Sequence, residues 1–200
     1  MSTTITPEST ATTFSMEAKE FARILSNASM FASKDGFRPV LKAVLIIVDG
    51  DKLHMVSTDS YALFEETATL DGNAGQARLL LSLTDAKALV KAVSKVKTGS
   101  IRLTLSDTLA AEFDGEMAIY EPVHGTYPDY LPSIPQSFAQ TQQIAFGSKL
   151  LAKVAKVKLS KESKTETGDV VRFAFIDAIK PATVTIGSDI RIILMPIRVS

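Results

Sequence analysis

The chain has 200 residues, of which 46% are hydrophobic and 22% are charged, and it contains no cysteine. A chain of this length and composition buries a hydrophobic core large enough to fold without a covalent cross-link, and it forms one large domain or two small ones. The lack of cysteine excludes disulfides, thiolate catalysis and nearly every structural zinc site. The 22 basic and 22 acidic residues give zero net charge, which excludes a generally basic surface and leaves only local positive charge.

The N-terminal residues 1–11 are polar and lack the basic and apolar regions of a signal peptide, so we expect a disordered lead-in. No apolar run reaches the length of a membrane span, and we expect no membrane partner. The absence of cysteine favours a reducing compartment, and the expected location is the cytoplasm.

Three segments share one order of predicted elements: a strand, an amphipathic helix and three further strands. The helices are expected at 17–31, 84–97 and 148–159, a spacing of about 65 residues that suggests a structural duplication. The alternative is a generic α+β domain in which the order recurs by chance. The expected strands are 12–16, 40–48, 52–57 and 61–68 in the first segment, 77–83, 101–105, 108–113 and 116–123 in the second, and 142–146, 170–176, 182–186 and 190–199 in the third.

Each predicted helix has an apolar stripe, and the first two have a candidate cap. Ser15 and Thr84 are the residue types that accept hydrogen bonds from the first turn of a helix. The apolar residues recur at helical spacing, which indicates packing against a core rather than a cofactor site. The stripes consist of Phe21, Leu25 and Ala28; Leu89, Val93 and Val96; and Leu150, Val154 and Val157.

The second and third predicted helices are basic on the face opposite to the apolar stripe. Together they hold eight lysines and one acidic residue, Asp85. A solvated helix face normally mixes charges, because like charges one turn apart repel. One interpretation is a solvated basic surface without a binding role. The other is a face that binds DNA phosphates without recognising the base sequence. Aromatic residues are absent from these faces, which argues against stacking on single-stranded bases.

The segment 121–140 contains four of the eight prolines and is interpreted as a connector. We therefore expect a two-repeat domain at 12–135 and a one-repeat unit at 136–200.

Motifs of enzymes and metal sites are mostly absent. His54 and His124 are the only histidines and do not form a metal-binding pair on a helix, so structural or surface roles are favoured. No Walker A loop or dinucleotide-binding glycine motif is present. The aspartates at 35, 49, 51 and 59 allow a metal cluster, but turn chemistry explains the first three more simply. We expect no enzyme activity, no metal and no cofactor.

Three groups of residues carry a family resemblance. They are the run 37–46 with the following hairpin 51–59, the segment 127–130 with 134–135, and the C-terminal Leu-Met-Pro-Ile-Arg-Val of 194–199. In this order they resemble the middle domain, the interdomain connector and the chain end of the bacterial DNA polymerase III beta sliding clamp.

The resemblance implies a shortened clamp. The family's first domain and the first half of its last domain have no counterpart, as would suit a phage or another mobile element. The family pattern Thr-Asp-Gly-His-Arg-Leu is here Thr58-Asp59-Ser60-Tyr61-Ala62-Leu63, which loses an arginine and gains an aromatic residue.

The resemblance also implies a function. A clamp of this family forms a ring around double-stranded DNA, with helices lining the pore and sheets outside. It is a DNA polymerase processivity factor that binds the polymerase and the clamp loader through a short peptide motif. The alternative is a clamp-like interaction or regulatory protein that binds a host replication or transcription component without encircling DNA. The DNA contacts would come from Arg23, Lys87, Lys91, Lys95, Lys149, Lys153 and Lys156.

The family's partner pocket lies between its middle and last domains. Ordinary edge packing of the same apolar residues is the alternative interpretation. The matching positions in this chain are Thr58, Leu63, Pro135, Ile193, Leu194, Met195, Pro196 and Ile197.

The rings of the family contain twelve strand–helix–strands units, and three units per chain imply a homotetramer. The first two units would pair within the chain, which leaves the third unit without a partner. We expect the third units of two chains to complete one domain, and the first units to meet in the same two-fold manner.

Overall fold

The computed structural model describes residues 11–35, 38–134, 144–159 and 170–198 of the chain. These ranges contain three α-helices and eleven strands, and each strand pairing between them is antiparallel. The α+β class predicted from the sequence is confirmed. Nearly all of the expected lead-in, 1–11, lies outside the described residues, as do the first two residues of the expected strand 142–146.

The first two predicted units follow the expected order. The first contains β1 (Thr12–Glu17), α1 (Ala18–Phe31), the short 3-10 helix η1 (Pro39–Lys42), β2 (Ala43–Asp49), β3 (Lys52–Thr58) and β4 (Ala62–Thr69). The second contains β5 (Gln76–Ser82), α2 (Leu83–Val93), β6 (Ser100–Leu105), β7 (Leu109–Phe113) and β8 (Glu116–Tyr120).

The third unit is shorter in its described part. The connector before it contains the 3-10 helix η2 (Leu131–Ser133). After the connector, Ala145 forms an isolated antiparallel bridge with Ile197. The unit then contains α3 (Ser148–Val154), β9 (Val171–Ala174), β10 (Ala182–Ile186) and β11 (Ile190–Leu194).

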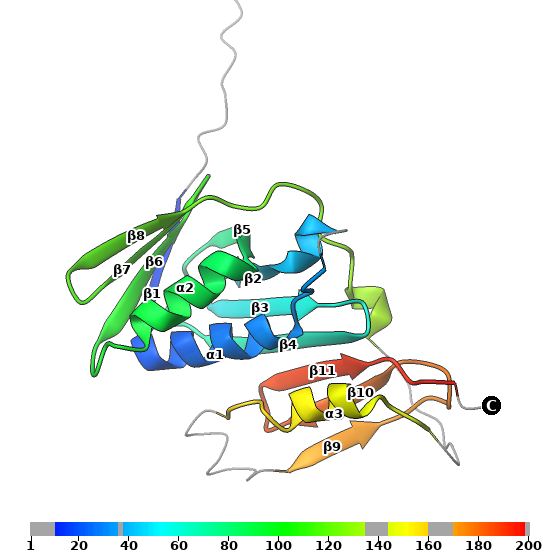
Figure 1. Ribbon diagram of the computed structural model, residues 1–200. Helices are drawn as coiled ribbons and strands as arrows, with labels where there is room; N and C mark the ends of the chain where they lie inside the picture. The colour runs from blue at the N-terminus through cyan, green and yellow to red at the C-terminus, as the bar shows by residue number, and fades with distance from the viewer. Residues whose placement is uncertain (1–10, 36–37, 135–143, 160–169, 199–200) are drawn as a thin grey trace, which may run out of the picture.

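The leading strands of the first two units are exchanged. Strand β1 pairs with β6 of the second unit, and β5 pairs with β2 of the first unit. Helices α1 and α2 pack side by side between these pairings (Figure 1). The exchange locks the first two units into one domain.

A seven-stranded sheet in the order β5-β2-β3-β4-β11-β10-β9 joins the third unit to the first. The joint is the pairing of β4 with β11, and α3 lies over the third unit's strands in Figure 1. Strand β1 of the first unit and β6, β7 and β8 of the second unit form a four-stranded sheet in the order β1-β6-β7-β8. The outer strand β8 of this sheet belongs to the second unit, whereas the first unit's outer strand β4 is already paired with β11 of the same chain. This order contradicts the expectation that the first units meet between chains.

The main core lies between the helices and the sheets. Phe21, Leu25 and Phe31 of α1 are fully buried, and the ring of Phe31 stacks on that of Phe64 with centroids 5.2 Å apart. A smaller cluster covers the opposite face of the seven-stranded sheet beneath the connector and includes Leu63, Tyr127 and Ile193. The connector thus protects the second face of the sheet.

Both predicted helix caps were wrong by a few residues. Ser15 lies in β1 opposite Arg102, and α1 follows Glu17, which makes no side-chain cap. The cap of α2 is Ser82, whose Oγ accepts from the Asp85 N–H at 3.1 Å. Helices α2 and α3 also end four and five residues earlier than predicted, at Val93 and Val154. No helix in the described ranges is long and apolar enough to cross a lipid bilayer.

Candidate functional sites

A groove of about 410 Å³ lies between the three helices and is rich in lysine. Helix α1 and the residues after it contribute Ser26, Ser29, Met30 and Lys34. Helix α2 contributes Lys87, Val90 and Lys91, and α3 and the turn after it contribute Lys153 and Lys156. Five lysines and no acidic residue line this groove, which makes it a site suited to an extended anion.

The amphipathic pattern of α2 explains how its lysines reach the groove. Ala86, Leu89 and Val93 are buried against the sheets, which turns Lys87 and Lys91 toward solvent one helical turn apart. On α3, Val154 enters the core, and Lys153 and Lys156 lie on the groove side. The basic faces predicted from sequence therefore converge on one surface.

The predicted DNA contacts divide into two groups. Lys87, Lys91, Lys153 and Lys156 line the groove, whereas Lys95, in the turn after α2, and Lys149, on α3, are exposed outside its lining. Lys34 was not predicted, because it follows α1 by three residues and lies outside the basic faces of the second and third helices.

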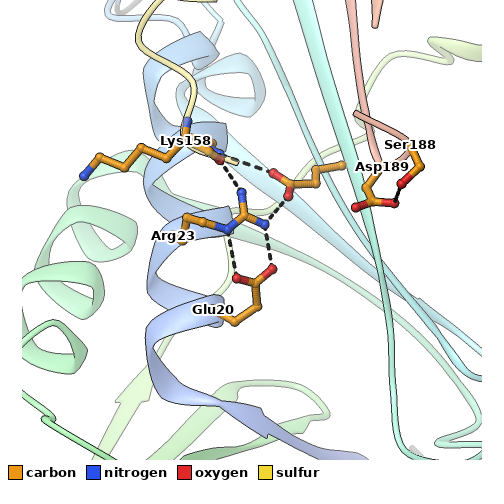
Figure 2. Close-up of polar contacts among 7 residues, drawn as sticks. Glu20, Arg23, Lys158, Ser188 and Asp189 are labelled. Carbon is orange, nitrogen blue, oxygen red and sulfur yellow. Dashed lines mark hydrogen bonds and ion pairs between the residues drawn. The ribbon is translucent and has the colours of Figure 1, made fainter. Parts of the chain in front are cut away.

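Arg23 does not lie in the groove lining, because its guanidinium is held inside the protein. Figure 2 shows it between the carboxylate of Glu20 and the carbonyl oxygen of Lys158. It also forms an ion pair with Glu66 of β4, and only 12% of the Arg23 side chain is exposed. Asn27 completes the cluster by donating to Lys158 O at 2.9 Å. This placement argues against the predicted contact between Arg23 and DNA.

Glu66 is the most buried member of this cluster. Burial raises the pKa of its carboxyl group above the ordinary value, although the neighbouring Arg23 acts to lower it. The cluster links α1, β4 and the segment after α3, which lie far apart in the sequence. Its role in the structure is to fix the third helix beside the first.

A second cavity, of about 180 Å³, lies on the opposite face of the β4–β11 joint. Four of the predicted partner-binding residues, Thr58, Leu63, Ile193 and Met195, line it together. The other lining residues were not predicted, and they come from η1 and the residue before it, from the turn before β4 and the first residue of β4, and from the connector. These are Arg38, Leu41, Ser60, Tyr61, Ala62, Pro128, Asp129, Tyr130 and Ser133.

The other predicted pocket residues lie elsewhere. Leu194 is fully buried in the main core on the helix side of β11, so its predicted place in the pocket was wrong. Pro196 and Ile197 follow β11 but do not line the cavity, and Ile197 bridges to Ala145. Pro135 lies outside the described residues.

Hydrogen bonds fix the turn that forms one wall of this pocket. Asp59 Oδ1 accepts from the N–H groups of Tyr61 and Ala62 at 3.1 and 3.0 Å. Thr58 Oγ1 donates to Ala62 O at 2.8 Å, and Ser60 has a left-handed φ of 75°. The Tyr61 side chain is held at the rim with 67% of its surface exposed. The residues that depart from the family pattern thus form an ordered turn.

The remaining polar candidates have structural contacts. His54 Nδ1 on β3 lies 3.0 Å from Thr67 Oγ1 on β4. His124, in the connector, lines a surface cavity together with Arg78 and Asp107. Across the described residues, no group of three histidine or acidic side chains is placed to hold a metal ion.

Comparison with solved structures shows the fold of bacterial sliding clamps. The DNA polymerase III beta subunit of Thermotoga maritima matches with a TM-score of 0.84 and 17% identity over 99% of this chain and 68% of its own. The sliding clamp of Bacillus subtilis matches with a TM-score of 0.79 and 15% identity over 100% and 67% of the two chains. The clamp of Bartonella birtlesii, solved with griselimycin, matches with a TM-score of 0.80 and 18% identity over 100% of this chain and 69% of its own.

The family is shown by sequence as well. Residues 15–129, more than half of the chain, match the profile of the DNA polymerase III beta subunit, central domain. A search of the curated proteins finds no match. The chain belongs to the DNA polymerase III beta subunit family, as its C-terminal and hairpin motifs indicated.

The cluster around Arg23 predicts a large effect on stability. An Arg23→Ala substitution leaves Glu66 buried without its counter-charge, so we expect the free energy of unfolding to fall by about 3 kcal/mol. The exposed Lys95→Ala variant serves as the control and is expected to change it by less than about 0.5 kcal/mol. Denaturant unfolding measures both. Equal stability of the two variants, with weaker DNA binding only for Arg23→Ala, would restore Arg23 to the DNA interface.

Proposed function

We propose that the chain is a DNA polymerase processivity factor, a non-catalytic clamp that encircles duplex DNA and tethers a polymerase. The observation that supports this most directly is the groove of five lysines between the three helices of a chain with zero net charge. Lysine ammonium groups neutralise phosphates without recognising bases, so the interface is sequence-independent. The chain would act in the cytoplasm of a bacterium or a phage-infected cell.

We assign the pocket at the β4–β11 joint to the polymerase and the clamp loader. Its lining combines apolar side chains from two strands with the aromatic rings of Tyr61 and Tyr130. A cavity of about 180 Å³ holds one or two side chains rather than a folded surface, which fits a short peptide with apolar anchors. In this assignment, residues 12–135 act as the two-repeat domain and 136–200 as the additional unit that completes the pocket.

The DNA interface is tested by removing three groove lysines together. The Lys87→Ala, Lys91→Ala and Lys156→Ala combination removes ammonium groups that face solvent, so folding is expected to remain intact. The salt dependence of duplex binding should then flatten, with the slope of log K against log salt falling by roughly 0.9 for each phosphate that is no longer neutralised.

A charge-matched control removes Lys42, Lys52 and Lys180, which lie outside the groove lining. It should leave the slope unchanged, because it alters net charge without altering the groove. Equal slopes for the two triple variants would contradict the assignment and favour the alternative of a clamp-like protein that does not encircle DNA.

We further propose a homotetramer in which the third units of two chains complete a domain. In the first two units the leading strands are exchanged, whereas β9 ends the seven-stranded sheet. The third unit exposes apolar side chains, among them Phe173 at 40%, which groups with Phe146 and Phe175 at centroid distances of 6.1–6.4 Å. Such an exposed face beside a free sheet edge is typical of an interaction surface.

The second contact of the tetramer would be formed by the second units. Strand β8 ends the four-stranded sheet, and its Met117 and Ile119 side chains are 63% and 62% exposed. Two copies of an antiparallel edge strand can pair about a two-fold axis, which gives a closed ring of four chains.

The tetramer predicts a mass in solution four times that of the 21.6 kDa chain. Light scattering coupled to size exclusion measures it. A charged substitution on the third unit, Phe173→Glu, should reduce the mass to that of a dimer, because it places a carboxylate in the apolar contact. A stable monomer or dimer of the unaltered chain at micromolar concentration would refute the closed ring.

A further inference from the structure

One ion pair connects the lysine groove to the pocket on the other side of the sheet. Lys153 Nζ on α3 lies within hydrogen-bond distance of Asp59 Oδ2, in the turn before β4. The side chains are only 26% and 20% exposed, so water screens the pair less than it screens a surface pair. The two residues are 94 positions apart in the sequence; Lys153 lines the groove, and Asp59 lies in the turn that forms one wall of the pocket.

Asp59 holds the pocket wall through its other carboxylate oxygen. Oδ1 accepts the N–H groups of Tyr61 and Ala62, and both of these residues line the pocket. The Tyr61 carbonyl in turn accepts from the N–H of Met195 at 2.9 Å, which fixes the opposite wall. A change in the position of the Asp59 carboxylate is therefore transmitted to both walls of the pocket.

Lys153 reaches this contact from the groove. Its ammonium lies 5.6 Å from the centre of the Phe31 ring, and its side chain lines the groove together with Lys156. A phosphate bound in the groove would add negative charge near Lys153, in competition with the Asp59 carboxylate. The flexible stem of lysine allows its ammonium to move toward such a charge.

We propose that Lys153 couples the two surfaces, so that duplex DNA in the groove competes with Asp59 for the ammonium and loosens the turn at the pocket. The coupling rests on the proposed DNA interface. In addition to its contact with phosphate, Lys153 acts here as a positioning residue for the pocket. By thermodynamic linkage, a peptide that tightens the turn would weaken DNA contact at the groove by the same factor.

The expected coupling is modest because the pair is partly solvated. A change of about threefold to tenfold in the opening of the turn lies at the lower end of typical allosteric couplings. The amides of Tyr61 and Ala62 report this opening directly, since their only described acceptor is Asp59 Oδ1.

The experiment measures hydrogen exchange and chemical shifts of backbone amides by NMR, with and without a mixed-sequence duplex oligonucleotide at low salt. In the unaltered chain, the duplex should shift the groove amides of Lys87 and Lys91. It should also speed exchange at Tyr61 and Ala62 by about threefold to tenfold.

Two variants remove the link, and one leaves it intact. Lys153→Met keeps the stem over Phe31 and removes the charge, and Asp59→Asn keeps the acceptor oxygen for the turn. In each, the duplex should still shift the groove amides but should no longer alter exchange at the turn. Lys180→Met removes an exposed charge that lines neither the groove nor the pocket, and it should behave as the unaltered chain.

Two results would overturn the coupling while the DNA interface stands. One is a response of the groove amides without any response at Tyr61 and Ala62 in the unaltered chain. The other is an equal response of the turn in the unaltered chain, Lys153→Met and Asp59→Asn. If no groove amide responds in the unaltered chain, the DNA interface fails and the coupling fails with it.

Discussion

The pairing of β4 with β11 is the constraint on which both functional surfaces depend. Residues Ala62–Glu66 pair with Ile190–Leu194 in an antiparallel register that joins the third unit to the first. Side chains alternate between the two faces of a sheet, so this register decides what each face receives. Phe64, Ile192 and Leu194 face the helices and enter the main core, whereas Leu63 and Ile193 face the connector and line the pocket.

A slip of one residue at this joint would exchange the two faces. Two ion pairs oppose such a slip. Glu65 pairs with Arg191 at 3.5 Å on the connector side, and Glu66 pairs with Arg23 on the helix side. The carbonyl of Lys158, bound by Arg23 and Asn27, then ties the segment after α3 to α1. The same contacts that hold the sheet register also bring the third set of lysines beside the first two.

The sequence predicted those features that depend on local periodicity. The helical stripes and the hairpin turns are repeated along the chain, and the structure confirms the elements at 17–31, 52–57 and 182–186 within a residue or two. Local periodicity does not show which residues of β11 face the core, because the last three residues of its sequence Ile-Arg-Ile-Ile-Leu are all apolar. The family resemblance placed Leu194 in the pocket together with Ile193, and the residue types alone could not separate the two, although the pleat sends Leu194 to the core. Arg23 was misassigned since its partners, Glu66 and Lys158, are 43 and 135 positions away.

The central claim is that the chain encircles DNA, and topology tests it more directly than affinity. The chain is loaded onto nicked circular duplex by the clamp loader of its host, washed at high salt, and then exposed to a restriction enzyme that cuts the circle once. A ring that encircles DNA remains on the circle through the wash and is released when the DNA becomes linear, since it slides off the ends. Equal release from circular and linear DNA would contradict encirclement and leave the lysine groove as an ordinary basic surface.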